Sequence, residues 1–145
     1  MKQTDFEIGE ELVERGEYDS AFCFFEAIAA APNQIPPIRA DAYTWMGTLV
    51  RIMPSLGDGD ECGLSFYKRA LELHPDNVWA MLGIVETFGD HFPDHQDAQA
   101  FCIAMRGLNQ RLEWFDDRTR KEITQICMRY ADAYSEGASA SRPND

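Results

Sequence analysis

Basic residues are scarce in this chain of 145 residues, in which 13 Lys and Arg stand against 25 Asp and Glu and give a net charge of −12. A surface this acidic repels phosphate backbones and anionic lipid headgroups, which argues against nucleic acid or a membrane as the partner. It favours a basic protein partner, because opposite fields speed encounter and reject wrong partners. Acidity also keeps a chain soluble without any partner, and composition alone leaves both interpretations open.

Long apolar runs are also missing. No stretch approaches the roughly 18 apolar residues of a membrane-spanning helix, and no apolar run follows Lys2 as it would in a secretory signal. Cysteine is sparse and scattered, without the Cys-x-x-Cys spacing of a zinc site. We therefore expect a cytoplasmic protein with reduced thiols that pack as small hydrophobic side chains. The four cysteines are Cys23, Cys62, Cys102 and Cys127.

The motifs of common catalytic sites are absent as well. There is no glycine-rich phosphate loop and no Gly-x-Ser-x-Gly elbow. The closest approach to a metal-binding cluster is His91 and His95 with Asp94 and Asp97, but Pro93 separates the two histidines, so they do not share one helix face. We therefore expect no enzyme, with no catalytic residue, no cofactor and no metal ion.

Apolar residues recur at three- and four-residue spacing along most of the chain, which is the period of an amphipathic helix. In the last such segment Ile123, Ile126, Cys127, Tyr130 and Tyr134 form one stripe. No sustained alternation of apolar and polar residues indicates a strand. The pattern predicts an all-α protein with helices at about 3–15, 19–31, 39–53, 61–74, 78–89, 95–108 and 117–135.

A short pattern recurs within these helices. Ala70-Leu71-Glu72-Leu73-His74-Pro75 is followed at once by Trp79-Ala80-Met81-Leu82-Gly83, and together these segments resemble the end and the beginning of tetratricopeptide repeats. Tyr43-Thr44-Trp45-Met46-Gly47 and Asp5-Phe6-Glu7-Ile8-Gly9 are similar to the same opening. The three closing glycines are 38 and then 36 residues apart, close to the family period of about 34.

The resemblance implies a right-handed α-solenoid of three helix hairpins, at about 3–35, 39–76 and 77–109, closed by a capping helix at 116–136. Residues 1–136 then form a single domain, and 137–145 form a disordered tail. Close packing predicts that a small residue on each first helix meets a small residue on the second. The expected pairs are Gly9 with Ala21, Gly47 with Gly63, and Gly83 with Ala98 or Ala100.

The resemblance also implies a concave groove lined by the first helix of each repeat. The first 30 residues carry eight acidic side chains against Lys2 and Arg15, so the first repeat is the acidic end of the molecule. We expect apolar residues of the groove to anchor a partner while acidic residues on its rim steer it. The predicted partner-binding residues are Phe6, Glu7, Glu10, Val13, Glu14, Asp41, Thr44, Thr48, Arg51, Asn77 and Ile84.

These features predict a non-enzymatic module that binds a basic, partly apolar protein, as a chaperone-like adaptor. Two alternatives remain open at this point. A short acidic chain also suits an immunity protein that neutralises a bacterial toxin, because many toxins are basic. Repeats with an exposed end could instead serve self-assembly into a structural homo-oligomer. The sequence identifies neither the partner nor the oligomeric state.

Overall fold

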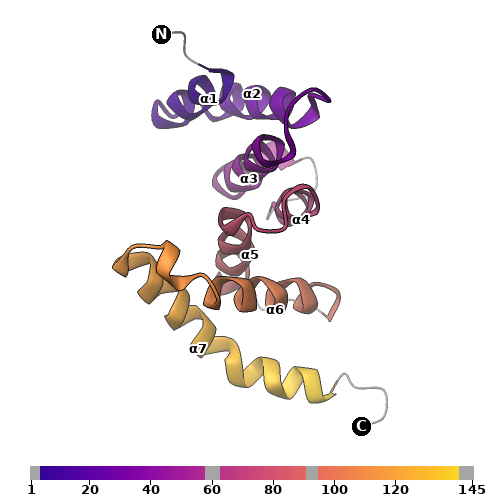
Figure 1. Ribbon diagram of the computed structural model, residues 1–145, viewed down its shortest axis with the longest axis vertical. Coiled ribbons are helices and arrows are strands. Elements are labelled where there is room, and N and C mark those ends of the chain that lie inside the picture. The colour runs from indigo at the N-terminus through magenta and orange to yellow at the C-terminus, as the bar shows by residue number, and fades with distance from the viewer. Residues whose placement is uncertain (1–3, 58–62, 91–94, 141–145) are drawn as a thin grey trace. The chain divides into compact units, whose positions relative to one another are not determined.

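The computed structural model describes residues 4–57, 63–90 and 95–140, with the side chains of 4–57, 63–87 and 99–128. This part of the chain is helical throughout and contains no strand, which confirms the all-α prediction (Figure 1). Its elements are α1 (Asp5–Glu14), α2 (Tyr18–Ala30), α3 (Pro36–Ile52), the short 3-10 helix η1 (Pro54–Gly57), α4 (Leu64–Leu73), α5 (Val78–Asp90), α6 (His95–Asn109), the 3-10 helix η2 (Leu112–Trp114) and α7 (Asp117–Ala140).

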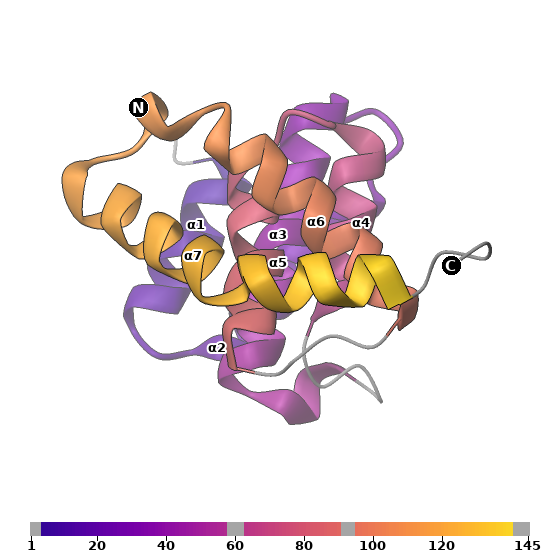
Figure 2. The same cartoon turned by 90° about the horizontal axis from the view of Figure 1, so that it is seen from below.

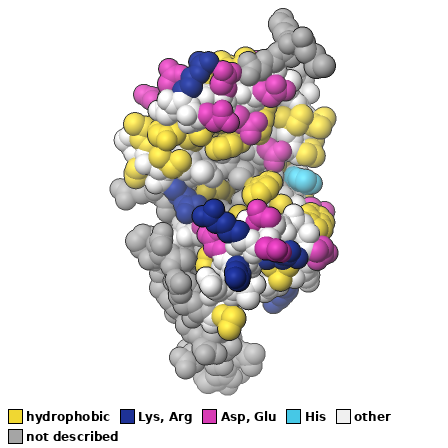
Figure 3. Space-filling view, turned by 90° about the vertical axis from the view of Figure 1, so that its left-hand side faces the viewer, with side chains coloured by type: hydrophobic (Ala, Val, Ile, Leu, Met, Phe, Trp, Pro, Cys, Tyr) yellow, Lys and Arg dark blue, Asp and Glu magenta, His cyan; other side chains and the backbone are white. Residues whose placement is uncertain are grey.

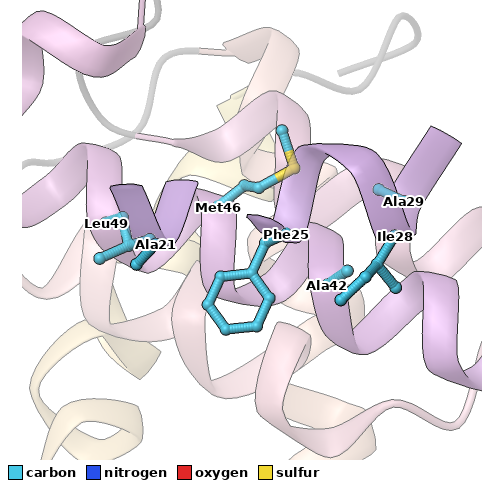
Figure 4. Packing of buried hydrophobic residues seen from close by; sticks show 7 residues of the cluster. All are labelled: Ala21, Phe25, Ile28, Ala29, Ala42, Met46 and Leu49. Carbon is cyan, nitrogen blue, oxygen red and sulfur yellow. The ribbon is translucent and has the colours of Figure 1, made fainter. Parts of the chain in front are cut away.

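The chain divides into two compact units, Met1–Gly83 and Ile84–Asp145, and the single domain expected over 1–136 stays a prediction. In the first unit, α1 packs on α2, α2 on α3, and α3 on α4. Its core lies between α2 and α3, where Phe25 and Ile28 meet Met46 and Leu49, with small alanines between them (Figure 4). The buried residues of α2 and α4 recur at three- and four-residue spacing, as the helical period predicts, whereas α1 buries Gly9 alone.

The second unit is built on the packing of α7 against α6 (Figure 1, Figure 2). The predicted stripe on α7 is buried at Ile123 and Ile126, and α6 buries Phe101 and Leu108. The helix α7 continues to Ala140, four residues beyond its predicted end at Glu136. Asp116 accepts a hydrogen bond of 2.8 Å from the backbone N–H of Thr119 and so begins α7.

Local chemistry explains the other helix ends. Thr4 caps α1 by accepting the N–H of Glu7 at 3.1 Å. Gly16, with φ of 78°, ends the same helix in a Schellman motif: its N–H donates to Val13 O, and the N–H of Glu17 donates to Leu12 O. The predicted start of α3 at residue 39 is wrong. The helix begins at Pro36, because proline in the first turn lacks only an N–H that has no helical acceptor.

The start of α4 is set by a glycine. Gly63 has φ of 72°, a left-handed conformation that side chains disfavour, and stands as the N-cap before Leu64. The helix therefore begins after the predicted position 61, although residues 61 and 62 themselves lie outside the described part. Between α3 and this helix the chain forms the single 3-10 turn η1.

Candidate protein-binding surface

The predicted acidic residues of α1 lie on its outer surface. Glu7 and Glu14 are exposed, and Glu10 is half-buried. Phe6 and Val13, the predicted apolar anchors, are half-buried because both pack against the core of the first unit. Acidic side chains gather over the end of the first unit that carries α1 and α2, with hydrophobic side chains beside them (Figure 3).

Phe6 owes its position to an aromatic cluster. Its ring meets Phe25 of α2 edge-on, with centroids 5.3 Å apart, and Phe25 in turn stacks on Trp45 of α3 at 5.5 Å. Such contacts fix ring orientation and contribute about 0.5–1.5 kcal/mol each beyond the area that they bury. Phe25 therefore links α1 to α3 from the core side and leaves only part of Phe6 for a partner.

Asp41 and Asn77, predicted as separate lining residues of α3 and α5, bind each other. The Asn77 amide nitrogen donates to Asp41 Oδ1 at 2.8 Å, while Asn77 Oδ1 accepts the N–H of Ala80 at 2.9 Å. One side chain thus caps α5 and ties it to α3. Asn77 is only 4% exposed, so this prediction placed a structural residue on the binding surface.

Thr48 and Arg51 of α3 both reach the hydroxyl of Tyr67. Thr48 Oγ1 lies 3.0 Å from Tyr67 Oη, and Arg51 Nη1 donates to the same oxygen at 3.5 Å. Tyr67 is fully buried, and a buried hydroxyl without a partner is costly. Both half-buried α3 side chains thus support the interior, with part of each still facing solvent.

Burial also removes Thr44 and Ile84 from the predicted binding surface. Thr44 is 8% exposed, and its hydroxyl donates to the carbonyl of Ala40 one turn earlier. Ile84 is 1% exposed. The structure therefore leaves eight of the eleven predicted residues with solvent-exposed area, once Thr44, Asn77 and Ile84 are set aside.

The repeated glycines make repeated contacts with aromatic rings. A Cβ at Gly9 would lie 2.8 Å from the ring of Phe25, and a Cβ at Gly47 would lie 2.9 Å from the ring of Tyr67. The predicted contact of Gly47 with Gly63 is confirmed. The nearest neighbours of Gly9 are ring atoms and not Ala21, because an aromatic side chain from the second helix fills the space that the missing side chain opens.

Gly83 also lies against an aromatic ring. Its nearest neighbours are ring atoms of Tyr67 on α4, and the side chain of Ala98, one of its two predicted partners, lies outside the described residues. Two glycines from different helices, Gly47 of α3 and Gly83 of α5, therefore lie against the ring of Tyr67. The glycines thus allow close packing within one predicted hairpin, α3 with α4, and also between successive hairpins, α4 with α5.

Sequence reasoning missed an exposed, uncharged and largely apolar face on α2. Ser20, Cys23, Phe24, Ala27 and Ala30 are all exposed, and Phe24 retains 36% of its area. They fall 0, 3, 4, 7 and 10 residues from Ser20, so they form one stripe on the helix, hereafter the α2 stripe. Because α2 is apolar nearly all round, its composition hides the period that separates this stripe from the buried one.

The thiols of the second unit favour the protonated, less reactive form. Burial raises the pKa of Cys102, against the weaker opposing effect of Arg106. Burial likewise raises the pKa of Cys127, partly offset by a hydrogen bond with the Asn109 side chain. Both therefore stay protonated at neutral pH, as small hydrophobic residues should. Cys23 differs from the prediction because it is exposed on the α2 stripe, and Cys62 lies outside the described residues.

The described part of the chain offers neither a metal site nor a membrane span. Among the side chains that the structure describes, no group of three or more His, Cys, Asp and Glu could hold a metal ion. The side chains of His91, Asp94, His95 and Asp97 lie outside that set. Within the described residues, none of the helices has the length and apolar character needed to cross a membrane.

Comparison of the chain with protein-family models, curated proteins and solved structures finds no significant match.

Proposed function

We propose that this chain is a cytoplasmic, non-enzymatic protein-binding module of the tetratricopeptide type, a right-handed solenoid that acts as a chaperone-like adaptor. Its partner is a basic, partly apolar segment of another protein. The resemblance to the repeat family is supported by the equivalent contacts of Gly9 with Phe25 and of Gly47 with Tyr67. In both hairpins a glycine of the first helix accommodates an aromatic ring of the second.

The observation that carries the proposal is the acidic surface of α1. Glu7 and Glu14 are exposed and Glu10 is half-buried, beside the partly accessible apolar side chains of Phe6 and Val13. Arg15, the one basic residue of the α1–α2 pair, already donates to Glu11 at 2.7 Å. Carboxylates around an apolar anchor steer a basic partner, and burial of apolar area then holds it.

An array of unstructured peptides with equal hydropathy and graded charge tests the proposal. We expect the basic members to bind and the acidic members to fail. Reversal of Glu7, Glu10 and Glu14 to Lys should weaken binding of the basic peptides by about tenfold or more without loss of helical circular dichroism, because these residues lie at the surface. Raising the salt concentration should slow association more than it speeds dissociation.

The matched control reverses three basic residues of α7, Arg118, Arg120 and Lys121, to Glu. This change should leave binding of the basic peptides close to that of the unmodified protein. Loss of binding in this control, with binding intact in the α1 variant, would place the site on the other unit. If neither variant nor salt changes binding, the acidity serves solubility alone.

A further inference from the structure

The α2 stripe is a second surface with the properties of a docking site. It is an uncharged, exposed face in a chain whose residues are 26% charged. Four of its five residues are small, and Phe24 stands among them with 36% of its area exposed. Helix axes pack 8–10 Å apart depending on the side chains at the contact, and small residues permit the closer approach. The stripe therefore suits a helix that brings its own large apolar residues.

The acidic residues beside the α2 stripe favour a partner with positive charge. Asp19 and Glu26 are exposed on one flank of the stripe, seven residues apart, which is about 10 Å along the helix. No Lys or Arg occurs between Arg15 and Arg39, so α2 has no basic residue of its own to offset them. A partner helix with two basic residues about seven positions apart would meet both carboxylates while its apolar face covers the stripe.

The same charges disfavour a second copy of this chain on the stripe. An antiparallel two-fold contact between two α2 helices brings identical flanks together, and in a parallel one the opposite flank of α2 offers no Lys or Arg to meet Asp19 and Glu26. In the antiparallel contact the row of Asp19 and Glu26 would face its own copy, and like charges at close range repel. We therefore propose that the α2 stripe docks a basic amphipathic helix of a different protein. This surface is separate from the α1 surface on which the proposed function rests.

The test uses a labelled synthetic helix as its probe, about 18 residues long, with leucines at three- and four-residue spacing and two lysines seven positions apart beside them. Fluorescence anisotropy should show saturable binding of this peptide to the full chain. A control peptide with glutamates in place of the two lysines should bind at least about tenfold more weakly. Failure of the lysine peptide to bind, or equal binding of the two peptides, overturns the proposal.

Protein variants locate the contact. Ala27→Lys places a charge in the middle of the stripe at an exposed helical position, so the fold should persist while the peptide affinity falls by about tenfold or more. Thr124→Lys adds the same charge at an exposed position of α7 and should change the affinity by less than about twofold. Equal affinities of the two variants would place the peptide elsewhere.

Two further measurements separate the outcomes. Asp19→Asn with Glu26→Gln should weaken peptide binding and flatten its salt dependence, because the flanking carboxylates are removed. Self-association of the unmodified chain in size-exclusion chromatography that Ala27→Lys abolishes would assign the stripe to a second copy and overturn the proposal. Ala27→Lys leaves Glu7, Glu10 and Glu14 of the α1 surface intact. If this variant still binds the basic peptides of the array, the proposed function holds whether or not the α2 stripe docks a helix.

Discussion

The ring of Tyr67 occupies the space into which a side chain at Gly83 would project. Tyr67 is fully buried on α4, and its hydroxyl forms a hydrogen bond with Thr48, so the ring cannot move away without loss of that hydrogen bond. The same ring limits the space at Gly47. One aromatic side chain thus sets how closely both α3 and α5 approach α4.

Substitution of Gly83 tests this packing directly. Ala in place of Gly in a helix interior ordinarily stabilises by up to about 1 kcal/mol. At Gly83 we expect a side chain to destabilise the fold instead. Gly83→Leu should lower the free energy of unfolding by about 1–3 kcal/mol or more through overpacking against Tyr67. Thermal and urea denaturation measure the change. A double-mutant cycle with Tyr67→Leu should show that the two changes are not additive, and additive effects would contradict the contact.

Gly63 and Gly16 form a matched pair of left-handed glycines, with φ of 72° and 78°. Alanine at Gly16 meets no atom within 4 Å, so it should cost only the backbone strain of about 1–2 kcal/mol. Alanine at Gly63 adds a clash with the backbone of Gly47 and should cost clearly more. Urea midpoints of the two variants give the comparison, and equal losses would mean that the close approach of Gly47 has no energetic weight.

The hydrogen bond between Asn77 and Asp41 can be tested by exchanging the two residues. Asn77→Asp keeps an oxygen to cap Ala80 but sets a carboxylate against Asp41, so stability should fall by about 1 kcal/mol or more. Asp41→Asn in the same chain restores one donor and one acceptor and should recover most of the loss. Calorimetry on the two single variants and the double variant measures the recovery. No recovery in the double variant would show that the pair does not act as a unit.

The N-terminus of α7 should respond to acid. The pKa of Asp116 is lowered, chiefly by hydrogen bonds from the backbone and side chain of Thr119, with smaller effects from Arg118 and Arg120. A pKa lower in the folded than in the unfolded chain means that the carboxylate form stabilises the fold. This contribution is complete above the unfolded pKa and is lost as pH falls through the folded pKa.

Asp116→Asn tests the contribution, since its amide oxygen can still cap Thr119 while the titrating group is gone. Melting midpoints measured from acid to neutral pH should show a flatter pH dependence for this variant than for the unmodified chain. Asp117→Asn is the control, because Asp117 pairs instead with the side chain of Arg120. A larger change in slope for the control than for Asp116→Asn would contradict the assignment.

Helix existence could be predicted from the sequence because the apolar period is local information. The seven predicted helices all occur in the described residues. The start of α3 lies three residues before its predicted position, because proline breaks the interior of a helix but is tolerated in its first turn. Gly63 could not be assigned as an N-cap, since a sequence carries no φ angle.

The binding surface was harder to predict for a different reason. Helical period tells which residues share a face, but not how closely the next helix approaches that face. Asn77 and Thr44 were therefore expected to face a partner, whereas each is satisfied within the chain. Conversely, the outward position of Phe24 follows only from the packing of α2 on α1 and α3, because α2 is apolar nearly all round.

The connection between α2 and α3 has a consequence for limited proteolysis. Residues 32–35 are exposed, while across them the Arg39 guanidinium donates to the carbonyl of Ala29 at 2.8 Å and the flanking helices share a core. A protease that cuts after Gln34 would therefore break the chain between α2 and α3, while the core that these helices share would hold the two fragments together. The two fragments should migrate together on a native gel, part in denaturant, and reassociate as complementary pieces when the denaturant is removed.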